Sequence, residues 1–351
     1  NIKEDDRVFY FTTCGWMMWN WLISSLSSKA TIFLYDGSPF YPHNEYLFEI
    51  IEKEQITFFG TGAKYLDHFK QNNLNIKKKY KLDKLNTIAS TGSPLIHETY
   101  EYVYDYIKKD IHLASISGGT DIVSCFVLGN PMQSVHAGEI QCKGLGMDVD
   151  IFDEYGNSLI LNKGELVCKS PFPSKPIYFH NDVDNQKYFN AYFSKYKNIW
   201  HHGDYASTTE AGGYIIYGRS DTTLNSGGVR IGTSELYRVV ENIQNIQECL
   251  ATELINKNDT EVILFVKTDN NILNDKFIKL IRDKIKNQLS PKHIPKKIIL
   301  VSDIPKTKSG KIVEVMVKKI INNEKIDNAN SLNNEDCLYE YYEIAKKLNE
   351  C

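Results

Sequence analysis

The chain has 351 residues, of which 42% are hydrophobic and 24% charged, and these proportions are typical of a globular protein with room for about two domains. Its net charge of -3 offers no basic surface to nucleic acid, and its seven scattered cysteines contain no C-x-x-C pair for a zinc site or disulfide framework. The most apolar stretch, residues 14–26, is interrupted by Asn20 and falls short of the ~20 residues that a membrane span needs. We therefore expect a cytoplasmic protein without nucleic-acid or membrane partners.

The first part of the chain alternates between strand-like and helix-like patterns. The strand-like segments are 31–37, 56–60, 85–90 and 111–119. The helix-like segments are 44–55 and 97–109, the second with Tyr102, Val103, Tyr106 and Ile107 on one face. This alternation predicts an α/β fold with a mostly parallel sheet, whose ligands bind at the carboxyl ends of the strands.

From about residue 130 the pattern changes twice. Alternating apolar and polar residues around glycine turns at 147–159 and 163–170 predict a β-rich subdomain. After residue 220 a small α+β unit follows, with helices predicted at 234–244 and 274–289 and strands at 261–267 and 297–301. The last thirty residues are rich in Asn, Glu and Lys and predict a frayed tail with one short helix.

The motif SGGTDI (117–122) follows a predicted strand. Gly118 and Gly119 allow close backbone approach, Thr120 offers a hydroxyl, and Asp121 offers a hard oxygen ligand for Mg²⁺. An ordinary turn explains the same residues.

The motif WHHGDY (200–205) places Asp204 after a glycine, where it could accept hydrogen bonds from ribose hydroxyls or form an Asx turn. His201 and His202 lack a third metal ligand at a suitable spacing and are expected to be surface or packing residues.

The basic segment IPKTKSGK (304–311) resembles a phosphate loop only superficially. Gly310-Lys311 has no glycine at the required upstream position, and Ile312 stands where that loop needs Ser or Thr. The block 217–241 places Arg219, Asp221 and Arg230 around a double glycine, ahead of a Thr-Ser-Glu helix cap. Capping does not explain the two arginines and the aspartate.

Taken in order, these segments resemble the adenylate-forming acyl-CoA synthetases, and most closely the branch that uses acetoacetate. The shared segments are FTTCGWMMWNW, LYDGSP, STGSPL, SISGGTDI, HHGDY, the GRSD to SGGVRIG block and PKTKSGK. The resemblance implies the C-terminal part of a large AMP-binding domain (1–219), a small mobile α+β lid domain (220–325) and a tail (326–351). It implies that ATP and CoA are substrates and that Mg²⁺ is the metal ion. It implies no tightly bound organic cofactor.

The resemblance also implies the nucleotide contacts. Gly92, Ser93 and Pro94 match the adenine-binding turn, while Gly119 and Thr120 match the phosphate-contacting segment. Asp121 takes the place of the more usual glutamate as the Mg²⁺ ligand.

Further positions follow from the same resemblance. Asp204 and Arg219 match the pair on the ribose hydroxyls, and Arg230 matches the arginine that reaches the phosphate. Lys311 matches the lysine that neutralises charge during adenylation. Thr120 is expected to be the second catalytic residue.

The remaining roles concern the acyl and CoA sites. Trp16, Met17 and Met18 match the wall of the acyl pocket, and Gly118 stands where acetate-specific relatives carry a closing tryptophan. This favours a short acid larger than acetate. Gly228 matches the residue beside the CoA channel, and Asp221 matches the hinge about which the small domain turns.

The family's glycine-rich phosphate loop is expected several tens of residues before FTTCGWMM, upstream of Asn1. We therefore expect this chain to be the C-terminal part of a longer protein, with the N-terminal portion as a complementing chain. The alternatives left open are a non-catalytic fragment from a split or decaying frame, a stand-alone nucleotide-binding module and a synthetase for another short acid.

Overall fold

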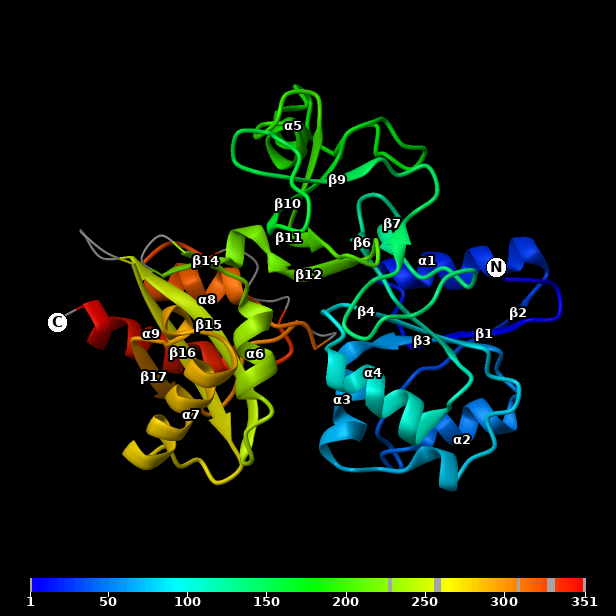
Figure 1. Ribbon diagram of the computed structural model, residues 1–351, viewed down its shortest axis with the longest axis horizontal. Coiled ribbons are helices and arrows are strands. Elements are labelled where there is room, and N and C mark those ends of the chain that lie inside the picture. Colours follow the sequence, from blue (N-terminus) through cyan, green and yellow to red (C-terminus); the bar gives the residue numbers. More distant parts are fainter. Residues whose placement is uncertain (1, 227–228, 256–259, 308–309, 327–331, 350–351) are drawn as a thin grey trace. The chain divides into compact units, whose positions relative to one another are not determined.

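The computed structural model describes residues 2–226, 229–255, 260–307, 310–326 and 332–349. The chain forms two compact units, Asn1–Ile216 and Tyr217–Cys351 (Figure 1). Among the described residues, no helix is long and apolar enough to cross a bilayer.

Unit 1 is built around a parallel five-stranded sheet of order β2-β1-β3-β4-β5. Its strands are β1 (Arg7–Tyr10), β2 (Thr31–Phe33), β3 (Phe58–Gly62), β4 (Thr87–Thr91) and β5 (His112–Ser115). The helices are α1 (Met17–Ser24), α2 (Tyr46–Lys53), α3 (Ala63–Gln71) and α4 (His97–Tyr102). The predicted parallel sheet is confirmed.

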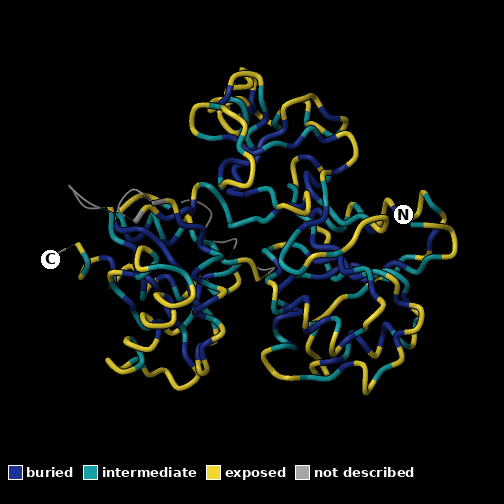
Figure 2. The backbone as a smooth tube through the Cα atoms, viewed as in Figure 1, coloured by how far each residue is buried: buried dark blue, intermediate teal, exposed yellow. Residues whose placement is uncertain are grey.

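The two faces of this sheet are covered by different helices because side chains alternate along each strand. Phe9 of β1 lies in the cluster formed with α2, α3 and α4, whereas its neighbours Val8 and Tyr10 lie in the cluster with α1. In α2 the buried residues recur at helical spacing: Leu47, Phe48, Ile50 and Ile51. Figure 2 shows the buried backbone concentrated in these elements, while the connecting loops are exposed.

Two segments differ from their predictions. The helix expected at 97–109 is α-helical only to Tyr102, and Val103–Ile107 winds as a π-helix. The strand expected at 111–119 breaks at Ile116. β5 stays in the parallel sheet, and β6 (Ser117–Gly119) pairs antiparallel with β7 (Ser124–Leu128).

The β-rich part of unit 1 continues from β7 and is confirmed. β6, β7 and β8 (Cys142–Lys143) form one small sheet, and a four-stranded sheet has the order β12-β11-β10-β9. Its elements are β9 (Val149–Phe152), β10 (Gly164–Cys168), α5 (Gln186–Tyr192), β11 (Trp200–Thr208) and β12 (Tyr214–Arg219), the last crossing the unit boundary.

Unit 2 has a hairpin and a three-stranded sheet. The hairpin is β13 (Leu224–Ser226) with β14 (Val229–Ile231), and the sheet is β15 (Ile246–Ile255), β16 (Thr260–Thr268) and β17 (Lys297–Leu300). The helices are α6 (Thr233–Val240), α7 (Asp275–Gln288), α8 (Glu314–Ile321) and α9 (Leu338–Asn349). The predicted helices α6 and α7 and strands β16 and β17 are present, whereas β15 was not predicted.

The sheet of unit 2 is buried on both faces. Val262 and Leu264 of β16 pack with α6 and α7, while Ile263 and Phe265 pack with α8 and α9. The expectation of a frayed tail therefore does not hold for α9, because Tyr341 is fully buried against Phe265 with ring centroids 5.0 Å apart. Its hydroxyl also donates to the Asp303 carbonyl at 3.0 Å.

Tyr341→Ala should destabilise unit 2 by about 3–5 kcal/mol, because it leaves a cavity where a large aromatic side chain was buried. Tyr339, on the same helix and 76% exposed, provides the matched control, and Tyr339→Ala should change stability by less than about 0.5 kcal/mol. All four tryptophans (16, 19, 21 and 200) lie in unit 1, so denaturant unfolding followed by far-ultraviolet circular dichroism and by tryptophan fluorescence separates the units. Equal effects of the two substitutions would mean that α9 does not dock as described.

Candidate active site

Three of the sequence motifs follow strands of the parallel sheet. FTTCGWMM follows β1, the turn at 92–94 follows β4, and the segment 117–121 follows β5. Because the strands are parallel, their carboxyl ends share one edge of the sheet, which is where ligands bind in open α/β folds. The fold thus brings these motif loops of unit 1 to a common edge.

The turn after β4 depends on Gly92. Its φ of +87° lies in the region that favours glycine, and nothing lies within 4 Å of the place where a Cβ would be. Gly92 is exposed, whereas Ser93 and Pro94 are half-buried and lead to the buried Leu95. The turn therefore offers open backbone at the sheet edge.

Asp204 on β11 is buried and lies against β6. The hydroxyl of Ser117 donates to its Oδ2 at 3.2 Å, and Nε2 of His202 lies 3.6 Å from the same oxygen. Nε2 of His202 is also 3.1 Å from the carbonyl oxygen of Gly118. Because a carbonyl only accepts, this hydrogen bond places a proton on Nε2. Asp204 thus belongs to a side-chain cluster that joins β6 and β11.

Gly118 and Gly119 both lack a side chain for a steric reason. A Cβ on Gly119 would lie 2.9 Å from Cε1 of His202, so a side chain there would displace the ring. A Cβ on Gly118 would lie 2.0 Å from the Ser124 carbonyl oxygen and 2.6 Å from Cα of Cys125. A side chain at 118 would therefore enter β7, and Gly118→Trp would test folding and not acyl specificity.

Thr120 and Asp121 are both exposed. Oδ2 of Asp121 accepts a hydrogen bond from the hydroxyl of Tyr192, whose ring stacks on Trp200 with centroids 3.7 Å apart. Among the described residues, no group of three or more His, Cys, Asp or Glu side chains could hold a metal ion.

The residues expected at the acyl pocket precede and begin α1. Met17 is buried, Trp16 is half-buried, and Met18 packs against the hydrophobic cluster that contains Val8 and Tyr10. The indole Nε1 of Trp21 donates to the Val123 carbonyl at 3.1 Å, which ties α1 to the segment after Asp121. The structure thus places α1 beside the 117–123 segment.

In unit 2 the chain leaves β12 at Arg219. Its carbonyl accepts hydrogen bonds from the hydroxyls of Thr222 and Thr223 at 3.0 and 3.1 Å, and its Nε lies 3.6 Å from Oδ1 of Asp221. Arg230 is exposed on β14 opposite Asn225. Gly228, expected beside the CoA channel, lies outside the described residues.

Lys311 is exposed at the end of a tight turn. The amide of Thr307 donates to the Lys311 carbonyl at 2.9 Å, and the amide of Lys311 donates to Thr307 Oγ1 at 3.2 Å. Gly310 adopts a φ of +82° inside this turn. These hydrogen bonds join Thr307 to Lys311, so the lysine is held on the backbone next to Gly310.

Glu314, at the start of α8, accepts hydrogen bonds from several side chains. The sequence patterns did not indicate this residue. Its Oε1 accepts a hydrogen bond from the hydroxyl of Tyr237 on α6 at 2.6 Å, and Thr222 and Thr233 also bond to its carboxylate. Burial raises the pKa of Glu314, although these hydrogen bonds oppose the increase. The carboxyl group connects the segment after Asp221 with the helix after Lys311.

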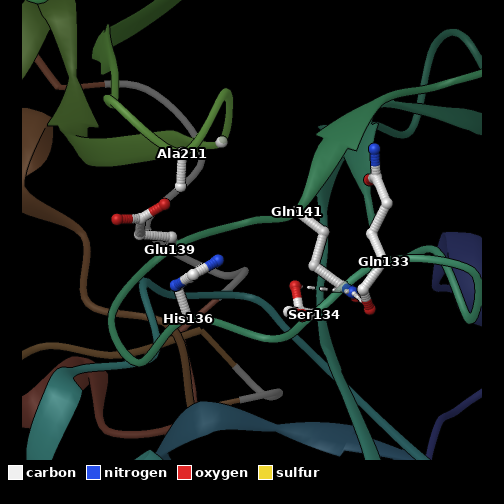
Figure 3. A pocket seen from close by; sticks show the side chains of 7 residues that line it. Gln133, Ser134, His136, Glu139, Gln141 and Ala211 are labelled. Carbon is white, nitrogen blue, oxygen red and sulfur yellow. Dashed lines mark hydrogen bonds between the residues drawn. The ribbon is translucent and has the colours of Figure 1, made fainter.

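A polar cavity of about 200 Å³ lies elsewhere in unit 1 (Figure 3). It is lined by Gln133, Ser134, His136, Glu139, Gln141, Ala211 and Gly213. Glu139 accepts a hydrogen bond from Thr209 at 2.7 Å, and Nε2 of Gln141 donates to the carbonyls of Asn130 and Gln133. None of the predicted site residues lines this cavity.

Comparison with known proteins extends over nearly the whole chain. It is 48% identical over 338 residues to acetoacetyl-coenzyme A synthetase of Rhizobium meliloti (strain 1021), a match that covers 96% of this chain and 52% of the relative. The acetoacetyl-CoA synthetase of Gallus gallus is 43% identical over 99% of this chain and 53% of its own length. No family model matches the chain.

Solved structures agree with the sequence matches. Acetoacetyl-CoA synthetase from Streptomyces lividans has a TM-score of 0.91 at 38% identity, covering 98% of this chain and 54% of that one. A benzoate CoA ligase from Burkholderia xenovorans LB400 has a TM-score of 0.74 at 21% identity, covering 90% of this chain and 62% of that one, and supports the fold alone.

The fold is that of the adenylate-forming acyl-CoA ligases. Within that superfamily the chain is homologous, over 96–99% of its length, to the acetoacetyl-CoA synthetases. It spans about half the length of the curated relatives that it matches.

The raised pKa of Glu314 predicts a pH-dependent effect of Glu314→Gln. In the unfolded chain the Glu314 carboxyl loses its proton at a lower pH than in the folded chain. The stability of the wild-type protein therefore falls as the pH rises from the ordinary pKa of glutamate through the raised pKa of the folded state. Glutamine does not ionise, so the stability of the Glu314→Gln protein relative to wild type should increase from about pH 4 to about pH 7.

Denaturant midpoints at both pH values measure this difference. Glu343→Gln is the control, because hydrogen bonding to Lys346 lowers the pKa of Glu343 and its substitution should shift in the opposite direction. A Glu314→Gln effect that is the same at both pH values would contradict the account.

Proposed function

We propose that this chain contributes to an acetoacetate–CoA ligase. In that reaction the carboxylate of acetoacetate attacks the α-phosphate of ATP and releases pyrophosphate. The thiol of CoA then attacks the acyl carbon of the acetoacetyl adenylate and releases AMP. The observation that carries the proposal is the 48% identity to an acetoacetyl-CoA synthetase over 96% of this chain.

The proposed nucleotide contacts follow the edge of the parallel sheet. Gly92, Ser93 and Pro94 contact adenine, and Gly119 and Thr120 approach the phosphates. The open backbone at Gly92 and the exposure of Thr120 support these roles. Asp121 would hold Mg²⁺, and the bound ion would supply positive charge near the phosphates.

Asp204 and Arg219 bind the ribose hydroxyls, and Arg230 contacts phosphate. Burial of Asp204 supports its role, because a carboxylate shielded from water forms stronger hydrogen bonds to hydroxyls. Trp16, Met17 and Met18 line the acyl site; Gly118 instead permits the close approach of β6 to β7. Gly228 lies beside CoA.

Lys311 acts in the adenylation step. Two anions, the acyl carboxylate and the α-phosphate, must approach each other, and a positioned ammonium lowers the cost of that approach. The exposed position of Lys311 on a closed turn supports a role toward a ligand. In the thioester step unit 2 turns about Asp221 and withdraws the lysine, as the resemblance to the family implies.

Lys311→Ala should therefore reduce acetoacetate-dependent ATP–pyrophosphate exchange by at least about 100-fold, since it removes the charge that stabilises the transition state. Transfer of the acyl group from supplied acetoacetyl adenylate to CoA should remain within about threefold of wild type, because the two steps use different groups. Both reactions are measured in a chimera in which this chain replaces its matching segment of the Rhizobium meliloti relative.

Lys325→Ala, at an exposed lysine in the same unit, is the matched control and should leave both reactions unchanged. Equal loss of both half-reactions in folded Lys311→Ala protein would remove the lysine from its proposed role. An inactive wild-type chimera that binds nucleotide would favour the nucleotide-binding module.

Asp204→Ala should weaken ATP binding to the chimera by roughly 10- to 100-fold, the value of a hydrogen bond to a charged group. Because Asp204 also bonds Ser117, Ser117→Ala serves as the control that removes this contact and keeps the carboxylate. Calorimetric titration should show near-normal affinity for Ser117→Ala. If both substitutions weaken binding equally, Asp204 acts through β6 and not on the ribose.

A further inference from the structure

Glu253 on β15 is a buried carboxylate with both oxygens engaged. Its side chain is 7% exposed, and Oε2 lies 2.7 Å from the ammonium nitrogen of Lys318 on α8. Its Oε1 accepts a hydrogen bond from the backbone amide of Asn225 on β13. The side chain therefore connects a helix, the central sheet and the hairpin of unit 2.

The backbone of Glu253 is also tied to α8. The side-chain nitrogen of Asn322, the residue after the last turn of α8, donates to the Glu253 carbonyl at 2.8 Å. Burying a carboxylate costs free energy unless it is paired and hydrogen-bonded, and removing one partner of such a pair is strongly destabilising. Lys318 and the Asn225 amide together compensate Glu253, so its position is fixed from two sides.

Glu253 is bonded to β13, and β13 pairs with β14, the strand that carries Arg230. Asn225 pairs with Arg230 in the antiparallel register of β13 and β14, with Leu224 opposite Ile231. Isolated two-stranded hairpins are at best marginally stable in water, so such a hairpin depends on external anchors. Leu224 and Ile231 supply an apolar anchor in the core, and Glu253 supplies a polar one at the next position.

We propose that Glu253 is a positioning residue for Arg230: it holds β13 to the sheet and so fixes where Arg230 presents its guanidinium to phosphate. The phosphate contact rests on the proposed function, whereas the anchoring of the hairpin does not. The guanidinium is useful only when its position is set before the ligand binds, because ordering it afterwards costs affinity. Glu253 acts on the reaction only through Arg230.

The anchor is tested in the 351-residue chain by hydrogen exchange of peptides within 222–232. Glu253→Ala removes the acceptor for the Asn225 amide and should accelerate exchange there by roughly 10- to 100-fold, the equivalent of one charge-assisted hydrogen bond. Glu253→Gln keeps an acceptor oxygen and should restore most of the protection. Lys267→Ala is the matched control, because it removes a 2.7 Å ion pair to Asp303 in the same unit.

Unchanged exchange in folded Glu253→Ala protein, or equal acceleration throughout unit 2, would overturn the anchor. Should Glu253→Ala not fold, Glu253→Leu with Lys318→Met replaces the pair with apolar groups and still lacks the acceptor. The same acceleration at 222–232 is then expected, and its absence would overturn the anchor.

The link to Arg230 is tested by a double-mutant cycle in the chimera described above. Glu253→Ala should raise the KM for ATP by about tenfold, with a smaller change in kcat, and should add nothing further in an Arg230→Ala background. Additive effects would show that Glu253 does not act through Arg230. A wild-type chimera without ligase activity, combined with faster hairpin exchange in Glu253→Ala, would reject the proposed function and leave the anchor standing.

Discussion

The cluster of Asp204, His202, Ser117 and Gly118 joins the segment after the parallel sheet of unit 1 to its β-rich part. The chain leaves the parallel sheet at Ile116, and the hydrogen bonds from Ser117 to Asp204 and from His202 to Gly118 hold that segment against β11. They add to the apolar contacts of Phe126 and Val127, which lie in one buried cluster with Leu166 and Trp200. The glycines serve this arrangement, because side chains at 118 and 119 would collide with β7 and with the His202 ring. The same contacts leave Thr120 and Asp121 exposed beyond the end of β6.

Unit 2 uses a related principle, with hydrogen-bonded carboxylates as anchors. Glu314 connects α6 and the segment after Asp221 to the start of α8, and Glu253 connects α8 and β15 to the hairpin. Each is hydrogen-bonded to several groups, as a buried or partly buried polar group requires. The helix after Lys311 and the strand paired with that of Arg230 are thereby attached to one sheet.

Sequence patterns predicted the parts of the fold that depend on local order. The alternation of strands and helices in unit 1, the β-rich segment and the amphipathic helices α6 and α7 all follow from side-chain periodicity. β15 was missed because Glu248 and Glu253 interrupt its apolar run, and only the structure shows that Lys306 and Lys318 neutralise them. The expectation of a frayed tail failed for α9 for a similar reason. Its burial depends on Phe265, far away in sequence.

The candidate site also has parts that the sequence indicates and parts that depend on residues distant in the sequence. The motifs carrying Gly92, Thr120, Asp204 and Lys311 were recognisable from residue order, but their supporting partners were not. Ser117 and Asp204 are 87 positions apart, and Tyr237 and Glu314 are 77 apart. The sequence around Gly118 does not show whether this glycine widens the acyl pocket or allows two strands to approach each other closely.

The most direct test of the account is product formation by the chimera supplied with ATP, Mg²⁺, CoA and a panel of short acids. Mass spectrometry of the thioester products, with AMP and pyrophosphate measured in parallel, gives kcat/KM for each acid. Acetoacetyl-CoA is the expected main product, with one AMP and one pyrophosphate released per thioester, and acetate is expected to be a poor substrate. A higher kcat/KM for acetate or for another short acid, in a chimera that folds and turns over, would contradict it.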